Sequence, residues 1–223
     1  VQLVQEGHVD GWDDPRMPTL TGARRRGYTA EGFRRFAERI GVSKANQLID
    51  FSVLEDCMRE HLNEVAPRRI AVLDPLKLLI TNYPEGKSEE CFAPNHPQKP
   101  EFGKRLIPFS RELWIEREDF NEEPPKGYFR LFPGNQVRLK YGYVVECTGC
   151  EKDADGNVSA VLATVVPDTR SGTPGADAVK VKGTITWVGA HDAVAAELRL
   201  FERLFTEDQP DADGRDFRTV LSP

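Results

Sequence analysis

The feature that most constrains the fold is a change of hydrophobic periodicity near Pro67. Before this residue, apolar side chains recur every three or four positions, which is the pattern of amphipathic helices. After it, short apolar runs are separated by closely spaced Gly, Pro, Asn and Asp, which is the pattern of strands joined by turns. The pattern predicts a multi-domain α+β protein, with a small helical part at residues 1–67 followed by a mainly antiparallel β part.

Three helices are expected in the helical part. Thr29 is a suitable helix cap, the apolar residues that follow share one face, and Gly41 ends the pattern. A second helix is predicted to start at a capping box that opens with Ser52 and to stop before Pro67. A short helix is expected within residues 18–27, with three arginines in its last turn, where cations complement the helix dipole.

Turn signals divide the β part into short strands. Residues 133–135 and 155–156 are typical of tight turns, and the second pair lies between two apolar runs, as in a hairpin. Residues 179–187 alternate with the period of a strand. The proline-rich residues 94–100 are expected to connect two separate β units. Residues 198–205 are ambiguous, because their apolar spacing also fits a helix.

Charge is distributed unevenly along a chain whose formal net charge is −6. Residues 124–145 contain four Lys or Arg and no Asp or Glu, and five aromatic residues are interleaved with these cations. Residues 192–223 have the opposite balance, with eight acidic and four basic side chains. Because binding to nucleic acid depends on local charge, the negative total does not exclude such a partner.

The basic stretch is predicted to form a hairpin from residues 126–132 and 136–145. Alternation along its strands then displays Arg130, Arg138 and Lys140 beside aromatic rings. Unpaired bases stack on such rings and accept hydrogen bonds from guanidinium groups, so the pattern suits single-stranded RNA. The alternative is a solvated basic hairpin whose aromatic residues belong to the core.

No other pattern indicates a catalytic or metal centre, and neither catalytic residues nor metal ligands are predicted. Cys147 and Cys150 form a C-x-x-C pair without the second pair of ligands that a structural zinc site needs, so two reduced thiols are expected. A redox or metal protein built on this pair is the competing hypothesis. Adjacent Asp13 and Asp14 are interpreted as loop-fixing residues, and His61 as a hydrogen-bonded core residue.

Composition bounds the class of protein. The chain has 223 residues, of which 39% are hydrophobic and 30% charged, enough for a packed core. No stretch approaches the roughly 18 apolar residues of a membrane span, and the first residues lack the pattern of a secretory signal. Four cysteines are too few for a disulfide scaffold. A soluble protein of the cytoplasm, without a membrane partner, is expected.

Several longer motifs follow one another in a recognisable order. They are residues 11–19 (GWDDPRMPT), 24–28 (RRRGY), 66–68 (APR), 72–78 (VLDPLKL), 95–97 (NHP), 108–110 (PFS) and 114–120 (WIEREDF). Together they resemble glutaminyl-tRNA synthetases, and the resemblance runs through essentially the whole chain. The first motifs are shared with archaeal and eukaryotic-type glutamyl-tRNA synthetases, whereas the later ones favour the glutaminyl family.

The resemblance implies a monomeric class I aminoacyl-tRNA synthetase that joins L-glutamine to tRNA(Gln) with ATP and Mg²⁺, and has no DNA partner. It implies a helical subdomain at residues 1–67, an incomplete proximal anticodon-binding β-barrel at 68–93 and 206–223, and a distal barrel at 94–205. Both barrels are expected to resemble ribosomal protein L25. The family's ATP-binding motif and catalytic lysine loop do not occur in this sequence, so these residues alone are not expected to aminoacylate.

The resemblance also assigns tRNA contacts to individual residues. Arg68 matches an arginine that contacts the central anticodon base, Arg130 one that reads the third base, and Arg138 one that contacts the first. Lys140 stands where some relatives have Arg, which keeps the charge but loses the two-pronged hydrogen bond. Lys44 matches a residue that touches the inner side of the tRNA.

Two further hypotheses stay open on the sequence alone. The first is a glutamyl-tRNA synthetase of the archaeal or eukaryotic type, because amino-acid selection would lie in a domain that these residues do not include. The second is a non-catalytic RNA-binding module that functions by itself.

Overall fold

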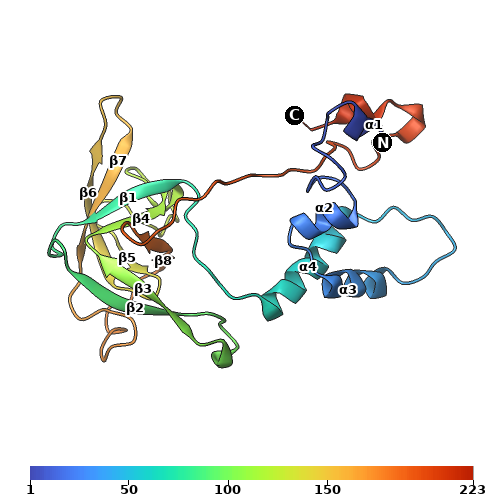
Figure 1. Cartoon of the computed structure of the whole chain (residues 1–223). Coiled ribbons are helices and arrows are strands. Elements are labelled where there is room, and N and C mark those ends of the chain that lie inside the picture. Colours follow the sequence, from blue (N-terminus) through green and yellow to red (C-terminus); the bar gives the residue numbers. More distant parts are fainter. Residues whose placement is uncertain (223) are drawn as a thin grey trace. The chain divides into compact units, whose positions relative to one another are not determined.

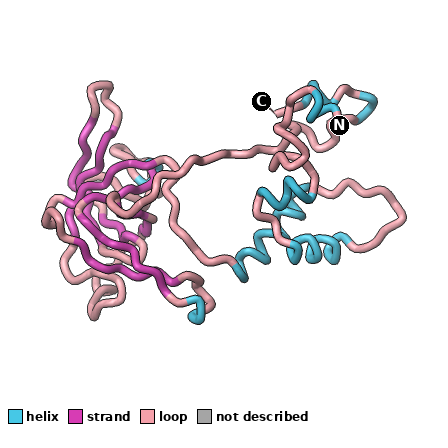
Figure 2. The backbone as a smooth tube through the Cα atoms, viewed as in Figure 1, coloured by secondary structure: helices cyan, strands magenta, loops and turns pink. Residues whose placement is uncertain are grey.

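The structure is a computed structural model that describes residues 1–222 as two compact units. One unit combines residues 1–66 with residues 198–222, and the other is the continuous stretch from Pro67 to Glu197. Figure 1 labels the α-helices of the first unit and strands β1 to β8 of the second, and Figure 2 shows the same division by secondary structure. The chain is therefore an α+β protein, as the change of periodicity predicts.

The first unit contains the α-helices of the described chain, which are α1 (Gln2–Gln5), α2 (Leu20–Arg25), α3 (Ala30–Ile40) and α4 (Phe51–Val65). The side chain of Thr29 caps α3 by accepting a hydrogen bond from the Gly32 N–H, and Gly41 ends the helix at a φ of 67°. The predicted start of α4 is wrong. Asp50, not Ser52, is its cap, because the Asp50 carboxylate accepts the N–H of Ser52 and carries a charge that suits a helix N-terminus.

Helices α3 and α4 pack against each other at one close approach. Gly32 leaves room for Met58, which is 2% exposed, so that a Cβ at position 32 would overlap its sulfur. Nearby, Thr29 Oγ1 lies 2.8 Å from His61 Nδ1. This contact confirms that His61 is hydrogen-bonded, but the residue is half-buried and does not belong to the core that was predicted for it.

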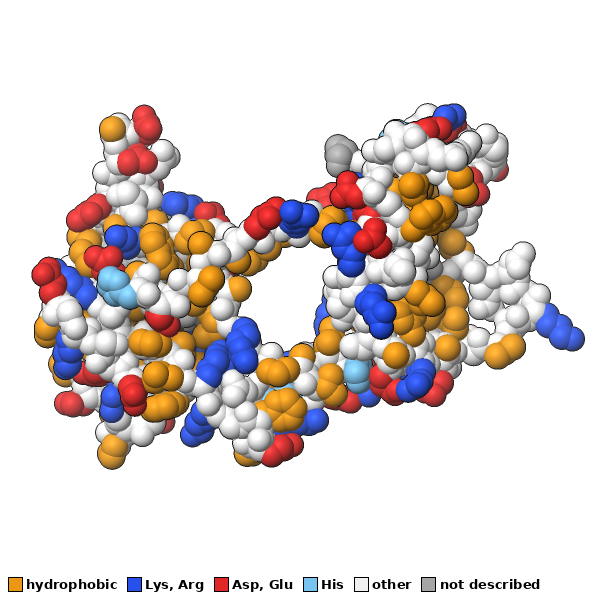
Figure 3. All heavy atoms as spheres, viewed as in Figure 1, with side chains coloured by type: hydrophobic (Ala, Val, Ile, Leu, Met, Phe, Trp, Pro, Cys, Tyr) orange, Lys and Arg blue, Asp and Glu red, His pale blue; other side chains and the backbone are white. Residues whose placement is uncertain are grey.

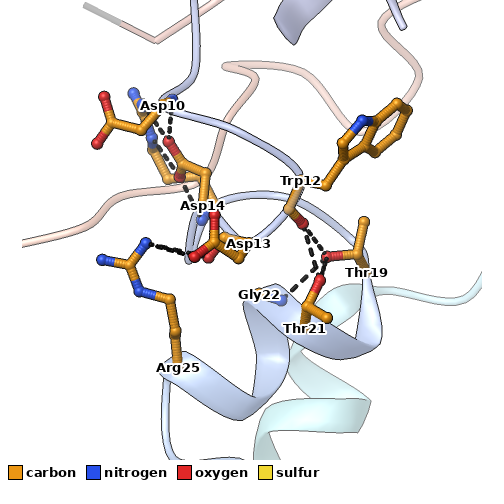
Figure 4. A network of polar contacts seen from close by, with 9 residues as sticks. Asp10, Trp12, Asp13, Asp14, Thr19, Thr21, Gly22 and Arg25 are labelled. Carbon is orange, nitrogen blue, oxygen red and sulfur yellow. Dashed lines mark hydrogen bonds and ion pairs between the residues drawn. The ribbon is translucent and has the colours of Figure 1, made fainter.

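The loop before α2 is held by two carboxylates with different roles (Figure 4). Asp14 is fully buried and accepts hydrogen bonds from the backbone N–H groups of Asp10 (3.0 Å) and Arg16 (2.9 Å). The Arg16 guanidinium, 2.8 Å from Asp14 Oδ2, holds the pKa of this carboxyl well below its usual range. Asp13 is exposed and pairs with Arg25 at 3.2 Å. The loop-fixing interpretation of this pair is confirmed.

The C-terminal residues complete the first unit. Leu204 packs with Val9 and Met17 in a small buried cluster, and Phe205 forms an isolated bridge with Leu221. Residues 198–203 have no helix, because most of their apolar side chains remain exposed and no partner surface supports a helical face. Two 3-10 turns follow, η3 (Ala212–Gly214) and η4 (Phe217–Val220).

The second unit is built on a seven-stranded sheet in the order β8-β5-β6-β7-β1-β4-β9. Its strands are β1 (Pro75–Ile80), β4 (Glu112–Glu116), β5 (Gln136–Leu139), β6 (Val144–Lys152), β7 (Val158–Val165), β8 (Gly183–Ile185) and β9 (Trp187–Gly189). Its pairs are antiparallel except for β1 with β7 and β5 with β8. The edge strands β8 and β9 are separated only by Thr186, so the sheet curls until its two edges nearly meet.

A separate pair of strands, β2 (Ser88–Pro94) and β3 (Lys104–Ser110), forms a long antiparallel hairpin. Residues 94–100 therefore lie at the end of this hairpin, together with the turn η1 (Pro100–Phe102), and the prediction that they connect two separate β units is wrong. Pairing between Pro94 and Lys104 keeps the two strands together up to that loop. The predicted division between residues 93 and 94 falls at the last residue of β2, and the assignment of a proximal and a distal barrel stays a prediction.

The predicted basic hairpin is also wrong. Residues 126–132 are not a strand, and Leu131 makes only an isolated bridge to Phe120. The antiparallel partner of β5 is β6, which is joined to it by a turn in which Tyr141 has a φ of 66°. The predicted turns at residues 133–135 and 155–156 are present, and the second joins β6 to β7. The strand expected at 179–187 begins only at Gly183.

The core of the second unit fills the inside of the curled sheet. Leu78 and Ile80 of β1 are fully buried, and Trp187 packs edge-to-face against Phe109 with 5.5 Å between ring centroids. The Trp187 indole N–H donates to the carbonyl of Lys140 at 2.9 Å, which satisfies its only polar group. This core fixes the turn between β5 and β6, where the candidate site begins.

Candidate nucleic-acid interface

Arg130 lies on the segment that precedes β5 and forms internal ion pairs. Its Nη1 lies 2.8 Å from Glu118 Oε1 and 2.7 Å from Asp119 Oδ1. Glu118 is well exposed, whereas the side chain of Asp119 is only 7% exposed. Burial raises the pKa of Asp119 to about 6, against the attraction of Arg130. Both carboxylates belong to the 3-10 turn η2 (Arg117–Asp119).

The backbone around Arg130 is held from both sides. Tyr128 donates its hydroxyl to the carbonyl of Glu118 at 2.9 Å, and the Asn135 amide donates to the carbonyl of Arg130 at 2.6 Å. Phe129 between them is half exposed, and the Lys182 ammonium lies 5.1 Å from its ring centroid. The segment therefore exposes the aromatic ring of Phe129, and Lys182, from a distant part of the chain, lies over this ring. The sequence pattern did not indicate the contribution of Lys182.

Arg138 lies in β5 and is largely buried, with 16% of its side chain exposed. Its Nη1 donates to the carbonyl of Thr169 at 2.9 Å, and its Nη2 donates to the carbonyl of Ala176 at 2.7 Å. These bonds tie the loop between β7 and β8 to the sheet. The Ser171 hydroxyl at 3.3 Å from Nη1 and the exposed Asp177 carboxylate at 4.0 Å from Nη2 are its further neighbours, so the guanidinium is held mainly by internal acceptors.

Lys140 and Arg68 lie on two different segments of the second unit. Lys140 is exposed at the end of β5, with its ammonium 5.5 Å from the ring centroid of Tyr141. Arg68 is half-buried, and its backbone N–H donates to the carbonyl of Asn95 at 2.6 Å. Asn95 and Arg105 both lie at the loop end of the β2–β3 hairpin, and Tyr141 opposes the lowering of the pKa of Arg105.

Lys44 stands apart from these residues in the chain. It is exposed in the loop between α3 and α4, within the first unit. The structure thus places Arg68 beside the loop end of the β2–β3 hairpin, Lys140 at the turn after β5 and Arg130 at η2, and it uses Arg138 to hold a loop. The acidic partners Glu118 and Asp119 were missed by the sequence argument, although they lie in one of the motifs that carry the resemblance.

The C-x-x-C pair lies inside β6. Cys147 is buried, Cys150 is half-buried, and both are free thiols. Burial raises the pKa of Cys147, which disfavours the thiolate that redox chemistry requires. No group of three or more His, Cys, Asp and Glu side chains in the described residues is placed to hold a metal ion. Within residues 1–222, no helix is both long and apolar enough to cross a membrane.

Three family models match the chain in succession. Residues 1–64 match the catalytic domain of class I tRNA synthetases (E and Q), residues 66–166 match an anti-codon binding domain of the same synthetases, and residues 184–223 match a second anti-codon binding domain. The boundary between the first two matches falls where the two structural units meet in the sequence.

Curated relatives align with the chain from end to end. Glutamine–tRNA ligases are 67% identical in Cupriavidus taiwanensis, 63% in Ralstonia nicotianae and 62% in Bordetella pertussis, in each case over 100% of this chain. The chain spans 38% of the length of each of these relatives.

Proposed function

This chain belongs to the class I tRNA synthetases for glutamate and glutamine, and we propose that it is the tRNA-recognition portion of a glutamine–tRNA ligase. The observation that carries the proposal is the identity of 62–67% with glutamine–tRNA ligases over the whole chain. It also favours the glutaminyl enzyme over the glutamyl one. The two anti-codon binding family models, which match residues 66–166 and 184–223, support a role in reading the anticodon.

The whole enzyme attaches L-glutamine to tRNA(Gln) and converts ATP to AMP and diphosphate, acting as a monomer in the cytoplasm. ATP and Mg²⁺ do not fit the residues of this chain, because the sequence has no Gly-rich phosphate loop and the described residues offer no carboxylate cluster for a metal. We therefore assign both to the part of the enzyme outside these residues. The curled sheet of the second unit supports a likeness to the barrel of ribosomal protein L25.

In this proposal Arg68, Arg130, Arg138 and Lys140 contact the anticodon, and Lys44 contacts the inner side of the tRNA. Anticodon bases unstacked from the loop expose edges that accept hydrogen bonds from guanidinium groups. Arg130 exchanges its ion pair with exposed Glu118 for such a base, since an exposed pair contributes little stability. A wrong base leaves the desolvated arginine without an acceptor, which costs about 1–3 kcal/mol per contact.

The test measures binding of an anticodon stem-loop of tRNA(Gln), and of the same RNA with a changed anticodon, to the chain and its variants. Arg130→Ala and Arg138→Ala are expected to weaken cognate binding by about tenfold and to reduce discrimination between the two RNAs, as loss of a base contact predicts. Fluorescence anisotropy at fixed salt gives both dissociation constants.

Arg24→Ala is the matched control, because it removes an exposed arginine of the first unit. It is expected to change both affinities by less than about twofold, since an isolated surface cation contributes little. Equal losses for all three variants would contradict the assigned readers. Circular dichroism checks that Arg138→Ala, which also removes a loop contact, keeps its sheet.

A further inference from the structure

Two arginines that the proposed function does not use lie together at the loop end of the β2–β3 hairpin. Arg69 is exposed, and its Nη1 donates to the carbonyl of Arg68 at 2.8 Å and to Asn95 Oδ1 at 3.3 Å. Arg105 is half-buried in β3, and its Nη1 donates to the carbonyl of Pro94 at 3.2 Å. Both guanidinium groups are thus oriented by neutral oxygens at one end of β2.

Neither arginine forms an ion pair with any carboxylate of residues 1–222. Burial and the neighbouring charge of Arg69 lower the pKa of Arg105. Four other arginines of the β unit have a carboxylate oxygen within 4.0 Å: Arg117, Arg130, Arg138 and Arg170. Two like charges kept together without a counter-charge form a local positive potential that an anion relieves.

The same surface carries further cations and few acids. Lys99 and Lys104 belong to the hairpin end, where Glu101 is the one acidic residue of the segment 94–105. The Lys99 ammonium lies 5.7 Å from the ring centroid of Phe102 in the same hairpin end. In the space-filling view, Lys and Arg side chains gather beside the hairpin (Figure 3).

We propose that Arg69 and Arg105 form a binding site for RNA phosphodiester groups, which holds the backbone beside the anticodon independently of base sequence. This inference rests on the proposed function, since the adjacent Arg68 is one of the proposed base contacts. A phosphodiester fits because guanidinium groups bind its two free oxygens with paired hydrogen bonds. The exposed cations around the pair, together with the Phe102 ring, extend the surface along a strand of RNA rather than around a single small anion.

The decisive property of a phosphate contact is that it is independent of base sequence and sensitive to salt. Each such contact contributes about 0.7–0.9 to the slope of log Kd against log salt concentration. We therefore expect Arg69→Gln/Arg105→Gln to lower this slope by about 1.5. The double variant should weaken the cognate and the anticodon-changed stem-loop by the same factor, about tenfold at moderate salt.

The control is Arg117→Gln/Lys152→Gln, which changes the net charge of the second unit by the same amount. Its two cations are exposed, as Arg69 is, but they are paired with Asp74 and Glu122. This control should keep the slope of the parent chain. Arg69→Lys/Arg105→Lys, which keeps both charges, should also keep it, and this variant separates a lost charge from a disturbed fold.

Three results would overturn the site: an unchanged slope in Arg69→Gln/Arg105→Gln, a change no larger than in the control, or a loss confined to the cognate RNA. The last result would make these residues base readers instead. Failure of the proposed function would give another result: the parent chain would bind the cognate and the anticodon-changed stem-loop equally. The change of salt slope in Arg69→Gln/Arg105→Gln would still show whether these two arginines bind phosphate.

Discussion

Asp119 combines an ion pair with burial, and burial has the larger effect on its titration. Its carboxylate lies 2.7 Å from Arg130, yet desolvation raises its pKa from the ordinary value of 3.8 to about 6. Between these two pH values the native state keeps a proton that the unfolded chain has released. Stability of the second unit therefore falls as pH rises from about 4 to about 6 and stays at the lower level above that.

Asp119→Asn should remove this pH dependence, because the amide resembles the protonated carboxyl and does not titrate. The free energy of unfolding of the variant, relative to the parent chain, is expected to rise by about 2 kcal/mol between pH 4.5 and pH 7, given about 1.4 kcal/mol per pKa unit. Urea unfolding followed by fluorescence of buried Trp187 gives this difference.

Glu118→Gln is the matched control at the neighbouring position. Its side chain is 75% exposed and also contacts Arg130, so its removal should leave the pH dependence of the parent chain in place. Parallel stability curves for the parent chain and Asp119→Asn would show that the buried carboxyl does not titrate in this range.

Strand β8 lies very close to the backbone of the segment that carries Phe129 and Arg130, and Gly183 is the point of contact. A Cβ at Gly183 would overlap the carbonyl oxygen of Phe129 and press on Val137, so only glycine lets the segment with Phe129 and Arg130 lie against this strand. The φ of Gly183 is not in the left-handed region, so the requirement comes from space alone.

Gly183→Ala is expected to destabilise the second unit by about 2–3 kcal/mol, because the backbone oxygen cannot move aside as a flexible side chain would. Thr184→Ala tests the same strand at an exposed position and should cost less than about 1 kcal/mol. Urea unfolding of both variants measures the two losses. If Gly183→Ala were as stable as Thr184→Ala, the segment would not be held against β8.

At the scale of the whole chain, the two units have separate cores although the first is made of two distant segments. Leu204, 7% exposed, joins Val9 and Met17 in the first unit, and Arg203 pairs with Asp50 at 3.4 Å. The large buried cluster of the second unit contains no residue from these segments.

Leu204→Ala should therefore destabilise only the first unit, by about 2–4 kcal/mol, as expected for truncating a buried leucine. Hydrogen exchange is expected to speed up in α1 and the following loop, while the strands of the second unit keep their protection. Leu200→Ala is the control, because Leu200 is 80% exposed. Loss of protection in the strands as well would mean that the two units unfold together.

Features that depend on near neighbours in the chain were predictable. The cap at Thr29, the stop at Gly41, the loop role of Asp14 and the hairpin around Gly156 follow from bonds between residues a few positions apart. The start of α4 was misplaced because Asp50 and Ser52 are both good caps, and only the local backbone distinguishes them.

The candidate site was predictable only in part. The sequence located the basic segment and, through family motifs, the residues proposed to contact tRNA. It did not predict that Arg130 pairs with Glu118 and Asp119, or that Arg138 holds the loop after β7. The alternation that suggested a shared face failed because residues 126–132 have no strand partner along their length.

By itself, the sequence determined the helical and β parts, the local caps and turns, and membership of a synthetase family, because these depend on residue order and short-range bonding. Only the tertiary structure decided that β1 pairs with β7 about 80 residues away, that β8 and β9 meet across a nearly closed sheet, and which acceptor each arginine uses. Strand pairing and ion pairing are settled by which distant segments bury their apolar surface together, and no local pattern encodes that choice.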